Sequence, residues 1–138
     1  MESELQIYQY TGEGLEKSYV NSAWMVGVKN YKPASDIRNM DCLERHMLTD
    51  ELFVPLTEGN LIVTMPLTEG AQMRVQKMEI GCIYSVPKGL WHNAIMPEGG
   101  KIILIERPDT SADNSEFYPL SDAQREILRI YAAACTAG

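Results

Sequence analysis

The stretch from Gly81 to His92, GCIYSVPKGLWH, decides the fold that the sequence predicts. An apolar run, Cys82 to Val86, precedes Pro87-Lys88-Gly89, and a second run, Trp91 to Met96, follows it. Proline and glycine favour tight turns, and short apolar runs between such turns are typical of strands. The stretch therefore predicts two strands joined by a turn, with His92 in the second strand.

The same alternation of short apolar runs and turn residues continues on both sides of this stretch. Each run is five to nine residues long, and glycine or proline separates most of them. Such spacing is typical of an all-β sandwich or barrel. The further runs are Leu5 to Tyr10, Ser22 to Val28, Leu52 to Leu56, Leu61 to Met65, Gln72 to Ile80 and Lys101 to Glu106, with an expected turn at Glu69-Gly70.

The pattern changes near the C-terminus, where a polar loop and then a helix are expected. The segment 108–120 is rich in turn-forming residues, so it predicts a loop, either a plain connection or a cover over one mouth of the barrel. Ser121 with Gln124 three residues later is typical of the start of a helix. Four apolar residues recur at helical spacing with Leu128 beside them, and they predict a stripe that packs outside the barrel: Ala123, Ile127, Tyr131 and Ala134.

These elements predict a single domain over residues 1–138, with a barrel over about 5–107, a loop over 108–120 and a helix over about 122–135. The net charge of −7, without a basic cluster, argues against a nucleic-acid partner, because phosphate binding needs a basic face. No apolar run approaches the roughly eighteen residues of a membrane helix, so we expect no membrane association.

The N-terminus and the cysteines indicate a cytoplasmic protein. The residues Met1 to Glu4 are acidic and polar, which predicts no export signal. Cys42, Cys82 and Cys135 are odd in number and lack the spacing of a metal site. We therefore expect reduced thiols in a reducing compartment.

The segment ERHMLTDE, which begins at Glu44, carries candidate chemistry together with His92. On a strand, Glu44 and His46 point the same way because they are two residues apart. A turn at 49–50 would bring Glu51 back on the neighbouring strand, near His46. Imidazole nitrogens and carboxylate oxygens are ligands for borderline or hard divalent ions. The chain has two histidines in all, and both lie in the two segments described.

The stretch first quoted resembles the second motif of the cupin superfamily, to which the small single-domain RmlC-like cupins belong. That motif reads G-x5-P-x-G-x2-H-x3-N. The residues that match it are Gly81, Pro87, Gly89 and His92, while Met96 stands where Asn is usual.

The segment that begins at Glu44 resembles the first cupin motif, G-x5-H-x-H-x3,4-E-x6-G, less completely. His46 matches the second His, Glu51 matches the Glu, and Gly59 matches the final Gly with one extra residue. Arg38 stands where the opening Gly is usual, and Glu44 stands where the first His is usual. The gap from Gly59 to the next motif has the length of two strands and a turn.

The resemblance implies a cupin-type jelly-roll β-barrel with one divalent metal ion at its centre. Carried over by position, the implied ligands are His46, Glu51 and His92, with Glu44 in place of the missing His. The donor set favours Zn²⁺, Mn²⁺ or Fe²⁺. Two carboxylates, two imidazoles and a divalent cation sum to zero charge, which weakens the pull on anionic substrates. Glu44 and Glu51 are also the catalytic candidates.

Strand parity gives an expected substrate pocket and an expected outer face. The residues expected to line the pocket are Phe53, Tyr84, Met96 and Trp24. Trp91 has the opposite parity to His92, so we expect it to pack outside the barrel.

The leading functional hypothesis is a metal-dependent enzyme that acts on a small polar metabolite, such as a sugar derivative or an organic acid, with the reaction type open. One alternative is a barrel that binds a small-molecule ligand without catalysis. Another is a metal-free acid–base isomerase of the sugar-epimerase kind, in which Glu44 and Glu51 crowd together and one keeps its proton. We also expect a homodimer in which the run from Leu5 to Tyr10 pairs with the partner's sheet.

Overall fold

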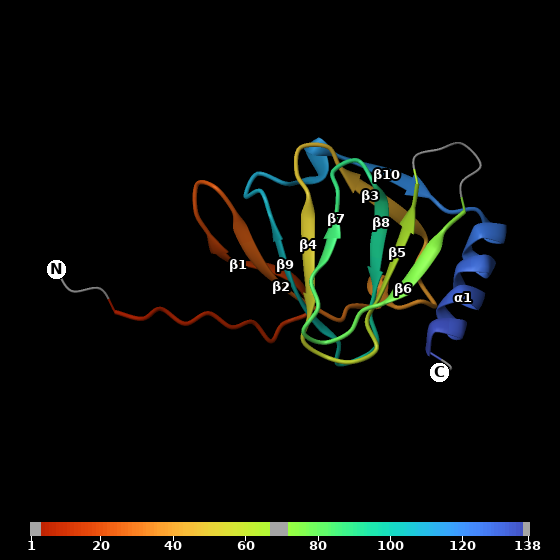
Figure 1. Cartoon of the computed structure of the whole chain (residues 1–138), viewed down its shortest axis with the longest axis horizontal. Helices are drawn as coiled ribbons and strands as arrows, with labels where there is room; N and C mark the ends of the chain where they lie inside the picture. The colour runs from red at the N-terminus through yellow and green to blue at the C-terminus, as the bar shows by residue number, and fades with distance from the viewer. Residues whose placement is uncertain (1–3, 67–71, 137–138) are drawn as a thin grey trace.

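The structure is a computed structural model that describes residues 4–66 and 72–136 (Figure 1). The expected turn at Glu69-Gly70 and the first three residues of the polar N-terminus lie outside the described residues. The elements are β1 (Gly14–Val20), β2 (Met25–Asn30), β3 (Cys42–His46), β4 (Glu51–Pro55), β5 (Leu61–Met65), β6 (Arg74–Lys77), β7 (Tyr84–Val86), β8 (Trp91–Ile95), β9 (Lys101–Glu106), β10 (Ser115–Pro119) and α1 (Asp122–Thr136), with short 3-10 turns at Pro33–Ser35 and Ala112–Asn114.

The strands form two antiparallel five-stranded sheets that face each other. The first sheet has the order β1-β2-β9-β4-β7, and the second has the order β10-β3-β8-β5-β6. Most strands that follow each other in the chain, such as β3 and β4, lie in different sheets, as in a jelly roll, whereas β1 with β2 and β5 with β6 form hairpins within one sheet. The predicted fold class, an all-β cupin-type jelly roll with a C-terminal helix, is confirmed.

The barrel interior is an apolar core between the two sheets. Along β9, Ile102, Leu104 and Glu106 are buried, while the residues between them are half-buried. This alternation turns every second side chain inward. It therefore brings the carboxylate of Glu106 into the barrel. The buried apolar residues of this core are Met25, Phe53, Ile62, Met78, Val86, Ala94, Met96, Ile102 and Leu104.

A second core lies between the outer face of the second sheet and α1 (Figure 1). The predicted capping box is present, because Ser121 Oγ accepts a hydrogen bond from the Gln124 amide (3.1 Å) and the Gln124 side chain accepts one from the Ser121 amide (2.9 Å). None of the helical segments in 4–66 and 72–136 has the length and apolar character that a bilayer crossing requires. Trp91 packs against this outer core, on the face that its parity predicts.

The contact of the helix is centred on Leu128, which the prediction placed at the side of the apolar stripe. Leu128 and Ala132 are the buried residues of α1, whereas Ile127 and Tyr131 are 42% and 37% exposed. Neighbouring helical residues differ by about 100° in direction. The side of α1 that packs on the sheet is therefore centred on Leu128 and Ala132, and Ile127 and Tyr131 lie at the edge of this contact.

The predicted first strand, Leu5 to Tyr10, does not pair with a sheet in this chain. The segment is extended, with Leu5 and Ile7 81% or more exposed, and it projects away from the barrel (Figure 1). The first strand is instead β1, which the sequence did not indicate. Its apolar side chains are irregularly spaced because a register shift between Lys17 and Tyr19 interrupts the pleat.

The predicted loop 108–120 is also only partly a loop. Its second half forms β10, which pairs with β3 in the register Ser115 to His46 and Phe117 to Glu44. The turn-forming composition concealed this strand, which lies at the edge of its sheet and ends at Pro119. The segment thus supplies part of the wall around the barrel mouth.

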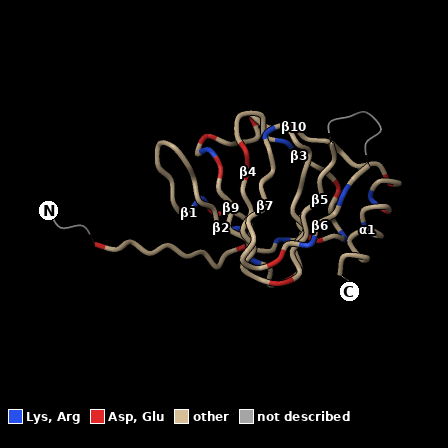
Figure 2. Tube along the Cα trace, viewed as in Figure 1, with Lys and Arg blue, Asp and Glu red and all other residues tan. Residues whose placement is uncertain are grey.

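Charged side chains are spread over the molecule. Figure 2 shows Lys and Arg at separated places on both sheets and α1, with Asp and Glu between them, along the described parts of the chain. Positive and negative residues therefore alternate along the described parts of the chain.

Candidate metal centre

A cavity of about 200 Å³ opens between the sheets at the end bordered by β10. Its lining includes Glu44, His46, Glu51, Phe53 and Glu106. A larger hollow of about 410 Å³ lies beside α1, but it contains none of the histidine or glutamate candidates. The smaller cavity is therefore the candidate functional site.

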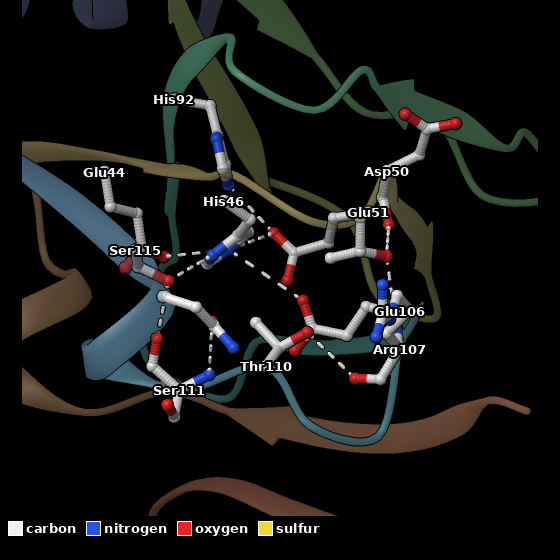
Figure 3. Close-up of polar contacts among 12 residues, drawn as sticks. Glu44, His46, Asp50, Glu51, His92, Glu106, Arg107, Thr110, Ser111 and Ser115 are labelled. Carbon is white, nitrogen blue, oxygen red and sulfur yellow. Dashed lines mark hydrogen bonds and ion pairs between the residues drawn. The ribbon is translucent and has the colours of Figure 1, made fainter. Parts of the chain in front are cut away.

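The four predicted ligand residues converge at this cavity (Figure 3). Glu44, His46, Glu51 and His92 each offer one ligand atom, and these atoms lie within 4.8 Å of one another. Glu44 pairs directly with His92 across β3 and β8. His46 and His92 are buried, and their rings meet edge to face with centroids 5.2 Å apart.

Glu51 reaches the others by a different route from the one predicted. The sequence suggested that a turn would return Glu51 on the strand next to His46. The chain instead crosses from β3 in the second sheet to β4 in the first, so Glu51 faces His46 across the barrel. The candidate site therefore joins the two sheets.

The distances between ligand atoms suit a small cation. His92 Nε2 lies 2.8 Å from Glu51 Oε1, and His46 Nε2 lies 3.4 Å from the same oxygen. His46 Nε2 lies 3.9 Å from Glu44 Oε1. Metal–ligand bonds of about 2.1 Å place adjacent ligand atoms roughly 3.0 to 3.4 Å apart in octahedral or tetrahedral geometry. The Glu44 carboxylate therefore lies slightly too far from His46 for a shared ion, whereas His46, Glu51 and His92 need little movement to bind one.

Hydrogen bonds fix which nitrogen of His46 carries the proton. Ser115 Oγ donates its one hydrogen to the carbonyl of Ser111 (2.7 Å), so it can only accept from His46 Nδ1 (2.8 Å). In neutral His46 the Nε2 atom therefore carries a lone pair. That atom is buried and has no hydrogen-bond partner among the described residues.

His92 is oriented in the same way. Its Nδ1 lies 3.0 Å from the carbonyl of Leu90, which can only accept a hydrogen bond. Its Nε2 lone pair therefore faces the carboxylate of Glu51 at 2.8 Å when the ring is neutral. Two electron-rich atoms at this separation need a proton or a cation between them. The donor set, with both outer nitrogens already bonded, fits a divalent metal ion.

Glu106 is a site residue that the sequence did not indicate. Its Oε2 lies 3.8 Å from His46 Nε2 and has no hydrogen-bond partner among the described residues. Burial, together with hydrogen bonding to Glu51 and the charge of Glu51, raises the pKa of Glu106 to about 9. Parity with the apolar residues of its strand was the one signal that could have revealed Glu106.

The pKa values of two other titratable groups in the site, Glu51 and His46, are shifted in opposite directions. Burial alone would raise the pKa of Glu51, but its interactions with His46, His92 and Glu106 outweigh burial and hold that pKa well below the usual range. Burial alone would lower the pKa of His46, but Glu51 and Glu44 outweigh it and raise the pKa above 6.5. The opposite directions in which the pKa values of Glu51 and Glu106 are shifted favour a single proton for this pair, with Glu106 as the favoured holder.

The predicted pocket residues are largely placed elsewhere. Phe53 lines the cavity, with its ring centroid 6.0 Å from that of His92. Met96 is buried in the interior core and borders the hollow beside α1 instead. Tyr84 is half-buried, and its hydroxyl accepts a hydrogen bond from the Glu79 amide. Trp24 is 48% exposed just before β2. Parity alone could not locate the open end of the barrel.

Known proteins resemble this chain in structure but not in sequence. No protein-family model and no curated protein matches the sequence. The chain is similar to a PAC13 variant from Streptomyces solved with uridine, at 7% identity over 88% of this chain and 98% of that one, with a TM-score of 0.54. It is also similar to a cupin-2 domain-containing protein from Shewanella frigidimarina, at 20% identity over 70% of this chain and 82% of that one, with a TM-score of 0.46.

A further similar structure is oxalate decarboxylase from Bacillus subtilis, at 18% identity and a TM-score of 0.49. The match covers 74% of this chain but 25% of that enzyme, so this chain spans a small part of its length. The jelly-roll topology places the residues of both motifs around one barrel cavity. The chain therefore has the cupin fold.

Proposed function

We propose that this protein is a metal-dependent enzyme that acts on a small polar metabolite, such as a sugar derivative or an organic acid. One observation carries the proposal. The Nε2 atoms of His46 and His92 are both held with their lone pairs toward Glu51, and this meeting point borders a cavity. A cavity of about 200 Å³ admits a small molecule rather than a polymer.

His46, Glu51 and His92 would hold the ion, with Glu44 as a fourth ligand at the less buried side. Zn²⁺, Mn²⁺ and Fe²⁺ suit two imidazoles and carboxylates. When bound, such an ion polarises a substrate oxygen as a Lewis acid. Glu106 would be placed to hold or release a proton in the same cavity, because burial and the neighbouring Glu51 raise its pKa.

A metal-free acid–base enzyme is the second candidate, and the pair of Glu51 and Glu106 favours it. The pKa of Glu106 is raised and that of Glu51 is lowered, and two carboxyl groups with pKa values moved apart are the arrangement that an acid–base isomerisation needs. The pair differs from the one expected from sequence, Glu44 and Glu51. A non-catalytic binding barrel would use the same cavity without either chemistry.

Elemental analysis after purification without chelators, followed by titration of the apo-protein with Zn²⁺ or Mn²⁺, separates these candidates. We expect one ion per chain, lost in His92→Ala and retained in Glu98→Ala, which removes an exposed carboxylate away from the cavity. A wild-type protein that binds neither ion at micromolar concentration would contradict the metal centre and favour the acid–base or binding candidates.

We also infer that the protein is a cytoplasmic homodimer. The N-terminal segment supports the dimer, because Leu5 and Ile7 are 87% and 81% exposed on an extended segment that pairs with no strand of the described chain. The edge strand β1 is a place where a second copy's segment can add. Cys42, Cys82 and Cys135 are free thiols, as expected in a reducing compartment. Sedimentation should give twice the chain mass, and deletion of residues 1–10 should give monomers. A monomer mass for the full chain at micromolar concentrations would contradict the dimer.

A further inference from the structure

Lys29 lies inside the barrel, where a lysine is unusual. Met25, Gly27 and Lys29 share one face of β2, and Met25 is fully buried in the interior core. Lys29 pairs in register with Ile102 of β9, whose side chain also faces inward. The Lys29 side chain accordingly lines the same cavity as the candidate metal centre.

The ammonium group of Lys29 has no protein partner in the described chain. Three carboxyl groups, those of Glu44, Glu51 and Glu106, line the same cavity, yet none makes an ion pair with Lys29 within 4.0 Å. The neighbouring Lys17 differs, because its Nζ donates to the carbonyls of Pro108 and Thr110 at 3.2 and 3.1 Å.

This arrangement leaves the Lys29 ammonium available to a ligand in the cavity. Burial lowers the pKa of Lys29, although the charges of Glu44 and Glu51 oppose that shift. The side chain is half-buried, and an ammonium that makes no hydrogen bond or ion pair with the described chain is free to meet an anionic group of a ligand. Because the carboxyl groups lie across a gap from Lys29 and not against it, the gap is the space in which an anionic group would meet the ammonium.

We infer that Lys29 binds a carboxylate group of the ligand, so that the metabolite is a small organic acid. This inference rests on the proposed function, because the other end of the ligand would meet the metal centre. Ionised Glu44 and Glu51 balance a divalent cation, and Lys29 adds one positive charge. The cavity of about 200 Å³ holds roughly six water-sized volumes, which fits a small acid of a few heavy atoms.

This charge balance corrects an expectation from sequence. The four ligands alone suggested a neutral site with little attraction for anions. With Lys29 included, a monoanion neutralises the site. A carboxylate on Lys29 would also leave an adjacent hydroxyl or carbonyl oxygen of the same molecule near the meeting point of His46, Glu51 and His92.

The test uses glycolate and its neutral amide, glycolamide, as probes of the full chain by calorimetric titration. Lys29→Met removes the charge and keeps the length of the side chain, Lys29→Arg keeps the charge, and Lys77→Met removes an exposed lysine on β6 as the control. We expect Lys29→Met to weaken glycolate binding by about tenfold or more, since a hydrogen bond to a charged group is lost. Glycolamide binding should be the same in wild type and Lys29→Met, and glycolate binding should survive in Lys29→Arg and Lys77→Met.

Three results would overturn the inference: glycolate affinity that is equal in wild type and Lys29→Met, an equal loss for glycolate and glycolamide, or no glycolate binding by the wild type at millimolar concentration. Thermal melting verifies folding, and Lys29→Met should melt near the wild-type temperature because the half-buried Lys29 side chain makes no ion pair with the described chain that the substitution would remove.

The same titrations on metal-free and metal-loaded protein separate this inference from the proposed function. Zn²⁺ affinity should not fall in Lys29→Met, because Lys29 repels the cation and is not a ligand. A protein that binds Zn²⁺ but recognises glycolate without Lys29 would overturn the inference alone. A protein that binds no metal, yet loses glycolate on Lys29→Met, would overturn the metal centre alone.

Discussion

Removal of the Ser115 hydroxyl tests whether the orientation of His46 serves a metal ion. Ser115 Oγ is the acceptor for His46 Nδ1 at 2.8 Å, and its own hydrogen is held by Ser111 at 2.7 Å. In Ser115→Ala the Nδ1–H of a buried imidazole has no acceptor. The ring is then free to turn, and its Nε2 lone pair no longer points reliably toward Glu51.

Two independent arguments give the size of the effect. A buried donor left without a partner costs about 1 to 3 kcal/mol, which corresponds to roughly 5- to 150-fold in affinity if the metal-bound state bears the cost. Outer partners of metal-bound histidines typically contribute 10- to 100-fold to metal affinity. We therefore expect Ser115→Ala to weaken Zn²⁺ binding by about 10- to 100-fold.

The assay is a competition titration of the apo-protein with Zn²⁺ against a chromophoric chelator at neutral pH. Ser121→Ala is the matched control, because it removes a serine hydroxyl that accepts a backbone hydrogen bond at the start of α1, away from the cavity. Ser121→Ala should lower thermal stability and leave Zn²⁺ affinity unchanged. Zn²⁺ affinity within threefold of wild type in Ser115→Ala would refute the argument that this hydrogen bond prepares His46 as a ligand.

Three further predictions concern the cation and the outer core. Glu44→Ala should weaken Zn²⁺ binding in the same titration, and Glu44→His should retain it; equal affinities for wild type and Glu44→Ala would exclude Glu44 as a ligand. Zn²⁺ affinity should fall as the pH drops through the raised pKa of His46, beginning above pH 6.5, because a proton then competes for Nε2. A Zn²⁺ affinity that stays the same from pH 8 to pH 6 would contradict this. Leu128→Ala should lower the free energy of unfolding by about 3 kcal/mol and the melting temperature by about 10 °C, because its side chain is buried. Ile127→Ala, at 42% exposure, should change the free energy of unfolding by less than about 1 kcal/mol. Similar losses in the two variants would show that a different side of the helix packs on the sheet.

The central strands could be predicted from the sequence because both of their faces are constrained. The runs Leu61–Met65 and Lys101–Glu106 coincide with β5 and β9, which lie inside their sheets. The edge strands β1 and β10 could not be predicted in this way. Each of these two strands pairs on one side only and carries polar residues toward solvent. In addition, β10 pairs with residues about seventy positions away in the chain.

The candidate ligands could be predicted because their order in the chain resembles two short motifs. Glu106, Ser115 and Lys29 lie outside both motifs, and their directions depend on which strands pair and in what register. Because Glu106 lies two residues after Leu104, the sequence could have predicted that its side chain points inward. Strand alternation does not predict where along the barrel axis that side chain lies. That position comes from the pairing of Met25 with Glu106, a contact that no local pattern reveals.

Because Glu51 belongs to one sheet and His46 and His92 to the other, a bound cation would act as a clamp between the two halves of the barrel. The clamp can form only after segments distant in the chain have met, so the ion would be captured late in folding. It would then leave the folding rate nearly unchanged and slow the rate of unfolding. The lifetime of the folded barrel, rather than the speed of its formation, would accordingly depend on the supply of metal.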